Sequence, residues 1–281
     1  MNDRQGESLA PMAGVLGWPV RHSLSPPLHR HWLQRYGLSG SYEHLPVPPE
    51  LFEDYVRALF VHGYVGANVT LPHKEAALSL CDDLDDAARA IGAVNTLIFR
   101  NGRIEGSNSD GFGFLENLRQ ALPQWDVTGG PAVVLGAGGA ARAVVYALRC
   151  AGAPEIRVLN RTLSRAERLV ADLGGSAVAK SWSSSALREA ALLVNTTSLG
   201  MAGQPVLDLD LAPLSVTAAV TDIVYRPLET DLLRRASAAG HPTVDGLGML
   251  LHQARPGFEA WFGRRPAVDA ALRTAVVSSL D

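Results

Sequence analysis

A glycine-rich turn between a strand and a helix restricts the fold of this chain more than any other feature. Residues 131–136 have the apolar character of a buried strand, and residues 140–151 have helical spacing. At the junction, Gly136 permits a tight turn, Gly138 lets the backbone approach a pyrophosphate, and small Ala141 allows close helix–strand packing. The N-terminus of the helix supplies amide donors to the anion. The sequence therefore predicts a dinucleotide-binding fold.

The next strand indicates which dinucleotide binds. The strand expected at residues 155–160 ends at Asn160 and is followed by Arg161 and Thr162, where an NAD-binding unit usually places Asp or Glu for the ribose 2'-hydroxyl. A guanidinium can meet a 2'-phosphate with paired, charge-assisted hydrogen bonds. We therefore expect NADP, with Arg161 as its ligand and Arg165 as a possible addition to the clamp. Either arginine has the alternative of an ordinary solvated side chain.

Strand-like and helical segments alternate along most of the chain, from Met12 to Asn108 and again after Pro131. Such alternation favours an α/β fold with mainly parallel sheets. Asn101-Gly102 predicts a hairpin and hence a mixed first sheet. We expect two domains: a substrate-binding domain of residues 1–109 with C-terminal helices 246–281, and a Rossmann-like NADP-binding domain of residues 110–245.

Composition excludes several classes of protein. The 281 residues are 47% hydrophobic and 19% charged, with a formal net charge of -3 and no block of like charge. We therefore expect small-molecule partners, no nucleic acid and no membrane. The polar first residues lack the apolar segment of a secretory signal. Cys81 and Cys150 match no metal-ligand spacing, which predicts free thiols, no metal site and a cytoplasmic location.

Polar side chains gather at the predicted strand ends of the first domain. Ser23 and Ser25 are one residue apart, so both hydroxyls face one side of an extended backbone and could hold a carboxylate; the alternative for Ser25 is a helix cap. Lys74 follows a strand end at the expected head of a helix, where the dipole would lower the pKa of its amine toward proton transfer. Its alternative is a solvent-facing lysine. Asp110 could pair with Lys74, and it could also be the N-cap of the next helix.

These segments occur in one order along the chain: GWPVRHSLSP, NVTLPHK, GAVNT, GSNSDGFG, GAGGAARA, NRT, NTTSLGM, DIVYRPLET and GLGMLLHQA. With these motifs in this order, the sequence resembles the shikimate dehydrogenase family from Gly14 to about Gln253. The resemblance implies NADP-dependent reduction of 3-dehydroshikimate to shikimate in aromatic amino-acid biosynthesis. Ser109 stands where the family usually has Thr and keeps the hydroxyl.

The resemblance also implies a role for each matched residue. Lys74 and Asp110 would be the catalytic pair. Ser23, Ser25 and Tyr225 would hold the substrate carboxylate, while Thr70, Asn95 and Gln253 would bond the ring hydroxyls. The cofactor would be bound by Gly136, Ala137, Gly138, Gly139, Ala140, Asn160, Arg161, Thr162, Arg165, Thr196, Ser198, Gly246 and Met249.

Three other functions remain open at this level. A quinate or quinate/shikimate dehydrogenase using NAD would be expected to carry an acid near Arg161, and this sequence has none. An aminoshikimate-type paralogue would have similar motifs. A non-catalytic NADP-binding module would have no need for Lys74 with Asp110. Either a monomer or a homodimer is expected.

Overall fold

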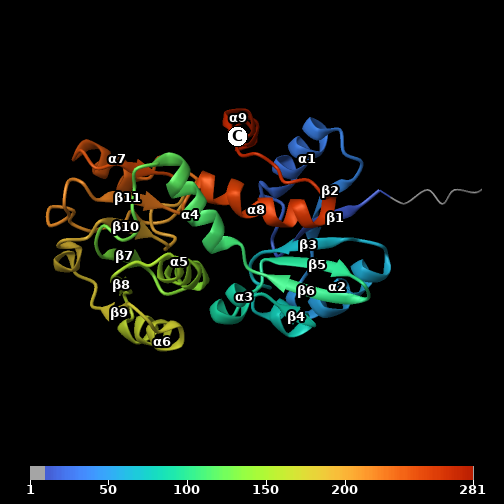
Figure 1. Ribbon diagram of the computed structural model, residues 1–281, viewed down its shortest axis with the longest axis horizontal. Helices are drawn as coiled ribbons and strands as arrows, with labels where there is room; N and C mark the ends of the chain where they lie inside the picture. Colours follow the sequence, from blue (N-terminus) through green and yellow to red (C-terminus); the bar gives the residue numbers. More distant parts are fainter. Residues whose placement is uncertain (1–9, 281) are drawn as a thin grey trace, which may run out of the picture. The chain divides into compact units, whose positions relative to one another are not determined.

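The computed structural model describes residues 10–280, which divide into two compact units (Figure 1). Unit 1 comprises the described residues up to Asp85, Ala93–Ser107 and the described residues from Ala254 onward. Unit 2 comprises Asp86–Gly92 and Asn108–Gln253. The polar N-terminal segment that bears on a secretory signal falls mostly outside the described residues, as does Asp281.

Two short segments group differently from the sequence-based boundaries. Asp86–Gly92 belongs to unit 2, where the Arg142 guanidinium donates to the backbone carbonyls of Ala90 and Ile91 at 3.4 and 2.6 Å. The helix after Gly246 is shared, because its residues up to Gln253 belong to unit 2 and the rest to unit 1. Long-range contacts of this kind leave no local signal in the sequence.

The sheet of unit 1 is mixed. Its order is β2 (Ser41–Pro46), β1 (Met12–Gly17), β3 (Gly66–Val69), β5 (Thr96–Arg100), β6 (Arg103–Ser107) and β4 (Asp83–Leu84). Strand β1 runs parallel to β2 and β3, and β4 runs parallel to β6, whereas β3, β5 and β6 pair antiparallel. The expected hairpin is confirmed, with Asn101 and Gly102 at φ 52° and 76° in its turn.

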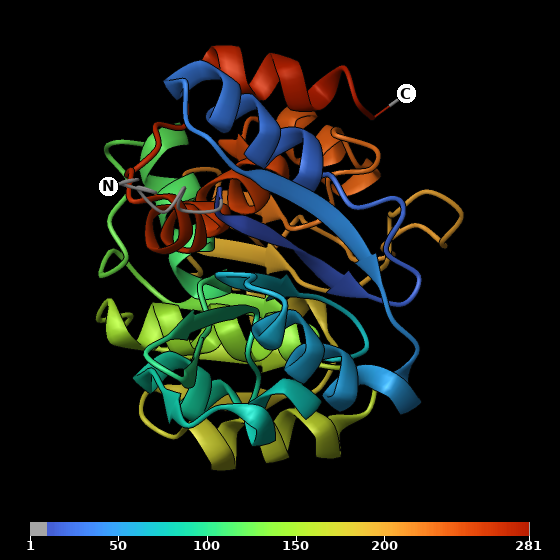
Figure 2. The ribbon, with the colours of Figure 1, turned by 90° about the vertical axis from the view of Figure 1, so that its right-hand side faces the viewer.

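Helices cover the sheet of unit 1, and two of them, one near each end of the described chain, pack against each other. They are α1 (Ser25–Tyr36), the 3-10 turn η1 (Pro49–Leu51), α2 (Phe52–Val61), the 3-10 helix η2 (Ala76–Leu80), the C-terminal part of α8 (Leu247–Phe262) and α9 (Ala270–Val277). Figure 2 shows α1 and α9 side by side. Near the start of α9, the Trp32 indole donates to the Ala267 carbonyl at 3.0 Å, and Arg35 pairs with Asp269 at 2.6 Å.

The sheet of unit 2 is wholly parallel. Its order is β12 (Thr243–Val244), β11 (Ala219–Asp222), β10 (Leu192–Asn195), β7 (Ala132–Leu135), β8 (Ile156–Leu159) and β9 (Ala177–Lys180). The order reverses between β7 and β10, which is the switch point of a doubly wound sheet. This confirms the predicted Rossmann-like fold. Strand β9 was not predicted, since its four residues alternate too briefly to stand out.

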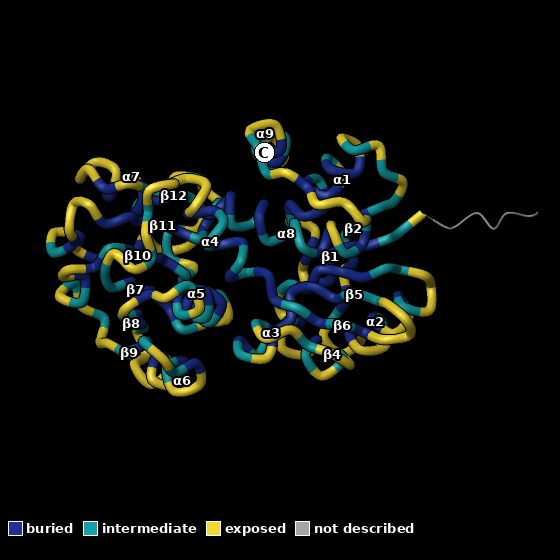
Figure 3. The backbone as a smooth tube through the Cα atoms, viewed as in Figure 1, coloured by how far each residue is buried: buried dark blue, intermediate teal, exposed yellow. Residues whose placement is uncertain are grey.

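Both faces of this sheet are covered. The helical elements of unit 2 are α3 (Asp86–Ile91), α4 (Asp110–Ala121), α5 (Gly139–Cys150), α6 (Leu163–Leu173), the 3-10 turn η3 (Ser184–Leu187), α7 (Asp231–Ala238) and the start of α8. Residues of α4, α5 and α6 pack on one apolar face, and residues of η3 and α7 pack on the other. Figure 3 shows the buried strands of both sheets beside helices such as α6 that expose one side. Within residues 10–280, no helix combines the length and apolarity needed to cross a bilayer.

Candidate active site

The glycine turn lies at the switch point of the unit 2 sheet. Gly136 has φ 112°, and a Cβ there would lie 2.7 Å from Thr196 Oγ1 at the end of β10. Gly138 and Gly139 are exposed at the start of α5, and a Cβ on either would meet nothing within 4 Å. The first amides of α5 have no intrahelical acceptors, and open space lies over two glycines beside them. The chain thus fits a pyrophosphate here, with half-buried Ala137 and Ala140 alongside.

The turn after β8 presents positive charge. The Asn160 amide donates to the Thr162 carbonyl at 2.8 Å and closes the turn. Arg161 and Arg165 are exposed, and across the described residues neither guanidinium is held in an ion pair or a side-chain hydrogen bond. Both arginines therefore remain available to a phosphate at the start of α6.

The segment after β10 is fixed by a buried network that the sequence interpretation did not include. The Thr196 hydroxyl donates to the Leu135 carbonyl at 2.6 Å, whereas Ser198 is exposed. Asn195, fully buried, donates to the Asp222 carboxylate at 3.0 Å and accepts from the amide of Thr197 at 3.0 Å. Asp222 also accepts from the Thr230 hydroxyl at 2.8 Å. Burial raises the pKa of Asp222, and its hydrogen bonds oppose this shift.

Helices α4 and α8 approach closely through glycine. A Cβ on Gly113 would lie 2.6 Å from the Met249 carbonyl oxygen, and one on Gly248 would collide with the Asn117 side chain. Gly246 is equally confined, since a Cβ there would lie 2.3 Å from the Ile223 carbonyl oxygen. Gly246 and Met249 are both predicted to lie near the nicotinamide; Gly246 is held against the carboxyl end of β11, and the Met249 backbone lies against Gly113 of α4.

Asp110 is the first residue of α4, and the N-cap position expected for it belongs to Ser109. The Ser109 hydroxyl donates to the Gln253 carbonyl oxygen at 2.8 Å. Asn108 accepts the Asp110 amide at 3.1 Å. The structure therefore brings Asp110 and Gln253 into one neighbourhood of unit 2. Tyr225, also in unit 2, is half-buried, and burial raises the pKa of its hydroxyl.

In unit 1, Ser23 and Ser25 lie together, although the backbone between them is turned rather than extended. Leu24 has φ -83° and ψ -1°, and the Ser25 amide donates to Ser23 Oγ at 3.3 Å. Because Ser23 Oγ acts as an acceptor in this turn, its own proton remains to be donated. Ser25 is 5% exposed and begins α1, and Pro26 and Pro27 follow it. Donors at a helix N-terminus suit a carboxylate.

Lys74 lies in a turn rather than at the head of an α-helix. The five-residue 3-10 helix Ala76–Leu80 follows it, so the helix-dipole argument made from the sequence does not apply. The loop is fixed by buried His73, which stacks on Phe52 with ring centroids 4.4 Å apart and bonds to the Val47 carbonyl at 2.8 Å. Val94 donates its amide to the Lys74 carbonyl at 2.8 Å.

Asn95 and Thr70 flank the same end of strand β3. The backbone carbonyl of Asn95 accepts a hydrogen bond from the Val69 amide at 2.8 Å, and the Thr70 amide donates to the Leu16 carbonyl at 2.9 Å. Asn95 is 2% exposed. Unit 1 therefore places Thr70, Lys74 and Asn95 on neighbouring loops, whereas Asp110, Tyr225 and Gln253 belong to unit 2.

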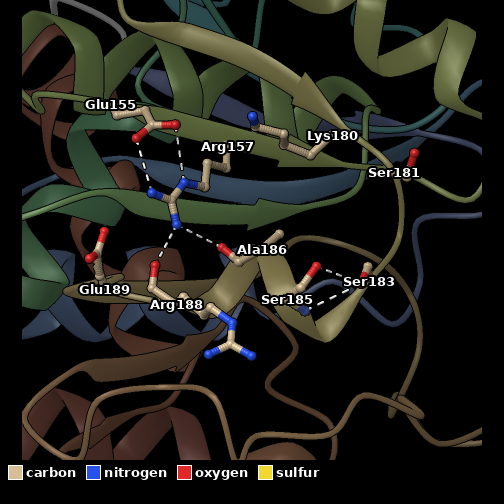
Figure 4. Close-up of a pocket in the computed structure, with 9 residues that line it drawn as sticks. All are labelled: Glu155, Arg157, Lys180, Ser181, Ser183, Ser185, Ala186, Arg188 and Glu189. Carbon is tan, nitrogen blue, oxygen red and sulfur yellow. Dashed lines mark hydrogen bonds and ion pairs between the residues drawn. The ribbon is translucent and has the colours of Figure 1, made fainter.

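A polar pocket of about 440 Å³ lies elsewhere in unit 2 (Figure 4). It is lined by Glu155, Arg157, Lys180, Ser181, Ser183, Ser185, Ala186, Arg188 and Glu189. Arg157 makes two bonds to Glu155, at 3.1 and 3.0 Å, and donates to the carbonyls of Ala186 and Arg188. The bonds to the two carbonyls fix η3 on the sheet. The hydrogen bonds from Arg157 lower the pKa of Glu155. None of the predicted cofactor residues lines this pocket.

A glycine turn at the switch point of a doubly wound parallel sheet defines the class: a dinucleotide-binding protein with a Rossmann-like domain. Within residues 10–280, no group of three or more His, Cys, Asp or Glu side chains could hold a metal ion. Three family models match the chain. They are the shikimate dehydrogenase substrate binding domain at residues 15–97, shikimate / quinate 5-dehydrogenase at 118–205 and the shikimate 5'-dehydrogenase C-terminal domain at 246–275.

Individual proteins agree with these models. Shikimate dehydrogenase (NADP(+)) of Paramagnetospirillum magneticum is 61% identical over 96% of this chain and 99% of its own length. Shikimate 5-dehydrogenase of Thermus thermophilus in complex with NADP(H) and shikimate superposes with a TM-score of 0.87 at 41% identity, covering 96% of this chain and 100% of that one. Quinate dehydrogenase of Corynebacterium glutamicum in complex with NAD reaches 0.89 at 29% identity, covering 96% and 99%. The chain belongs to the shikimate dehydrogenase family.

Proposed function

We propose that this chain is an NADP-dependent shikimate dehydrogenase, which interconverts 3-dehydroshikimate and shikimate in the shikimate pathway. The observation that carries this proposal is the 61% identity, over nearly the whole chain, to a protein of that activity. The geometry of the two units supports it, because one unit offers a dinucleotide turn and the other a set of small polar side chains.

NADP is the cofactor, bound by unit 2. The α5 amides receive the pyrophosphate, and Arg161 with Arg165 receives the 2'-phosphate. The quinate dehydrogenase that superposes on this chain was solved with NAD. A carboxylate near the 2'-position would repel a phosphate, and the turn at residues 160–162 carries a guanidinium instead.

The substrate is held by side-chain hydroxyls at its carboxylate, and by one hydroxyl and two side-chain amides at its ring. Ser23, Ser25 and Tyr225 bind the carboxylate of shikimate. Thr70, Asn95 and Gln253 bond its ring hydroxyls. These assignments are supported by the turn that leaves the Ser23 proton for donation and by the position of Ser25 at the N-terminus of α1.

Lys74 is the proton donor. When bound, NADPH supplies the hydride that reduces the ring ketone. Lys74 gives a proton from Nζ to the ketone oxygen as negative charge develops there, and in the reverse direction its neutral amine accepts the hydroxyl proton. Asp110 orients the ammonium and the reacting hydroxyl. The loop that carries Lys74 is held by the stacked pair of His73 and Phe52.

A panel of steady-state assays tests the proposed function. Shikimate, quinate and aminoshikimate would each be titrated with NADP and with NAD. We expect the highest kcat/KM for shikimate with NADP. A preference for quinate with NAD, or for aminoshikimate, would replace the proposal by the corresponding paralogue. Light scattering on the same preparation would decide between the expected monomer and homodimer.

The carboxylate site has its own test. Ser25→Ala should weaken shikimate binding and leave NADP affinity unchanged, as measured by calorimetry. Ser79→Ala is the matched control, because Ser79 is an exposed serine of unit 1 whose hydroxyl donates to the nearby Ala76 carbonyl at 2.9 Å. An unchanged shikimate affinity in Ser25→Ala would remove this residue from the site.

A further inference from the structure

A continuous series of buried polar side chains crosses the core of unit 1 and includes two of the proposed substrate residues. Its members all lie on strands or strand ends of one sheet or at the start of α1. They are Ser25 at 5% exposure, Tyr42 at 1%, Asn68 at 5%, Asn95 at 2% and Thr96 at 1%. Buried polar groups lower stability unless they are hydrogen-bonded, and satisfied networks hold side chains in one arrangement.

The direction of each hydrogen bond follows from the first. The Tyr42 hydroxyl donates to Asn68 Oδ1 at 2.6 Å. Asn68 Nδ2 therefore points the other way, to the Asn95 backbone carbonyl at 3.1 Å and to Thr96 Oγ1 at 3.2 Å. Because Thr96 Oγ1 accepts this bond, its own proton goes to Asn95 Oδ1 at 2.9 Å. The side-chain orientation of Asn95 is thus set by Tyr42 through two intermediates.

This orientation has a chemical consequence. Because Asn95 Oδ1 accepts from Thr96, the Nδ2 end of the amide is turned away from Thr96, and this end can act only as a donor. At the other end of the series, burial raises the pKa of the Tyr42 hydroxyl, and a hydrogen bond with the Ser25 side chain opposes that shift. The series therefore joins the residue proposed for the carboxylate to a residue proposed for a ring hydroxyl.

The Tyr42 ring packs against the aromatic rings of two neighbouring residues. His29 stacks on it with centroids 3.9 Å apart and planes inclined by 2°. Trp261 lies 6.0 Å away on another side. A phenylalanine at position 42 would keep these ring contacts and lose only the hydroxyl, so the hydroxyl can be tested separately from the packing.

We propose that Tyr42 is a positioning residue for substrate recognition, whose hydroxyl aims the Asn95 amide through Asn68 and Thr96. This inference rests on the proposed function, because it assigns Asn95 to the substrate. It adds that Tyr42, Asn68 and Thr96 determine shikimate affinity without touching shikimate.

Tyr42→Phe tests the proposal. We expect the KM and the dissociation constant for shikimate to rise about fivefold to tenfold, the usual effect of one neutral hydrogen bond, while kcat and the KM for NADP stay within about twofold. Tyr36→Phe is the matched control, since the Tyr36 hydroxyl also makes one hydrogen bond in unit 1, accepting the Ala267 amide at 2.9 Å. It should leave all constants unchanged.

A double-mutant cycle separates this proposal from the proposed function. Asn95→Ala should weaken shikimate binding, and adding Tyr42→Phe to it should have a smaller effect than in the wild type, because only the bond between Tyr42 and Ser25 still leads to a substrate residue. If Asn95→Ala leaves shikimate affinity intact, the substrate role of Asn95 fails. If the two losses add fully, or if Tyr42→Phe changes kcat alone, the positioning role of Tyr42 is overturned. Should Tyr42→Phe fail to fold, Thr96→Val removes the last donor in the series and must give the same shift in KM.

Discussion

Several residues proposed for the cofactor in unit 2 are exposed, whereas two residues proposed for the substrate in unit 1 are buried. Gly138, Gly139 and Arg161 are exposed, whereas Ser25 and Asn95 are 5% and 2% exposed. A dinucleotide presents phosphates that backbone amides and a long guanidinium can reach from the surface of a fold. A small polyol offers only short polar groups, so the protein side chains that bind it must already be held in the correct orientation by their neighbours. We therefore expect the two units to bind their ligands by different physical means.

Their buried polar clusters differ in charge as well. The cluster around Tyr42 and Asn68 is neutral, and the adjacent His29 is fully buried with its pKa lowered to about 3 by desolvation. The cluster of unit 2 contains Asp222, whose pKa is raised by burial. Lowering the pH should therefore destabilise unit 1 through His29 and relieve unit 2 at Asp222.

The largest expected effect is that of Lys74→Ala. Loss of a general acid typically slows turnover by about a hundred- to ten-thousand-fold, and the loss should fall on kcat. Folding should survive, which circular dichroism would verify. A folded Lys74→Ala protein with near-normal kcat would return this lysine to a solvent-facing role.

The partnership of Lys74 with Asp110 makes a narrower prediction. Asp110→Asn should also slow turnover, and the double variant should be little worse than the more damaged single variant, because residues that act as a unit are non-additive. Steady-state kcat values of the three variants measure this. Fully additive losses would show that the two residues act independently.

Arg161→Ser should affect the cofactor side alone. A charge-assisted bond to the 2'-phosphate contributes roughly 1.5 to 3 kcal/mol, so the KM for NADP should rise about tenfold or more. The KM for NAD should barely change, since NAD lacks that phosphate. Arg168→Ser, on the same helix α6, is the control. Equal losses with both cofactors would identify Arg161 as structural.

His29→Phe should reduce the acid sensitivity of unit 1. A histidine whose folded pKa is about 3 stabilises the fold above its unfolded pKa near 6.5, and this contribution is lost as the pH falls from 6.5 toward 3. Between pH 8 and pH 5 the loss is about 2 kcal/mol. Urea unfolding of wild type and variant at both pH values measures it. Parallel pH profiles would contradict the assignment.

Asp222→Asn should have the smallest effect and the opposite sign. Because burial raises its folded pKa, the stability that Asp222 contributes is fully present below its unfolded pKa and falls as the pH rises through the folded value. An amide keeps an acceptor for the Asn195 amide and does not ionise. The free energy of unfolding of Asp222→Asn should therefore lack this decrease, and a variant that retains it would place the titrating group elsewhere.

Local sequence was sufficient where the backbone itself makes the site. Gly136 and Gly138 could be interpreted from their spacing, because a turn and a helix N-terminus involve only neighbouring residues. Arg161 was predicted in the same way to be a ligand of the 2'-phosphate. Local inference failed at Lys74, where the loop ends in a 3-10 helix, and at Leu24, where a turn replaces the extended backbone expected between the serines.

The sequence by itself determined the α/β class, the dinucleotide turn and the choice of phosphate over hydroxyl at the 2'-position, since each depends on residues close together in the chain. Only the tertiary structure decided how Asn95 is oriented and that Asp222 is buried. Tyr42 and Asn68 are 26 residues apart, and Asn68 and Thr96 are 28 apart. Side chains so distant in sequence become partners only when strand pairing aligns them, and the requirement that a buried donor find an acceptor then fixes the direction of every bond.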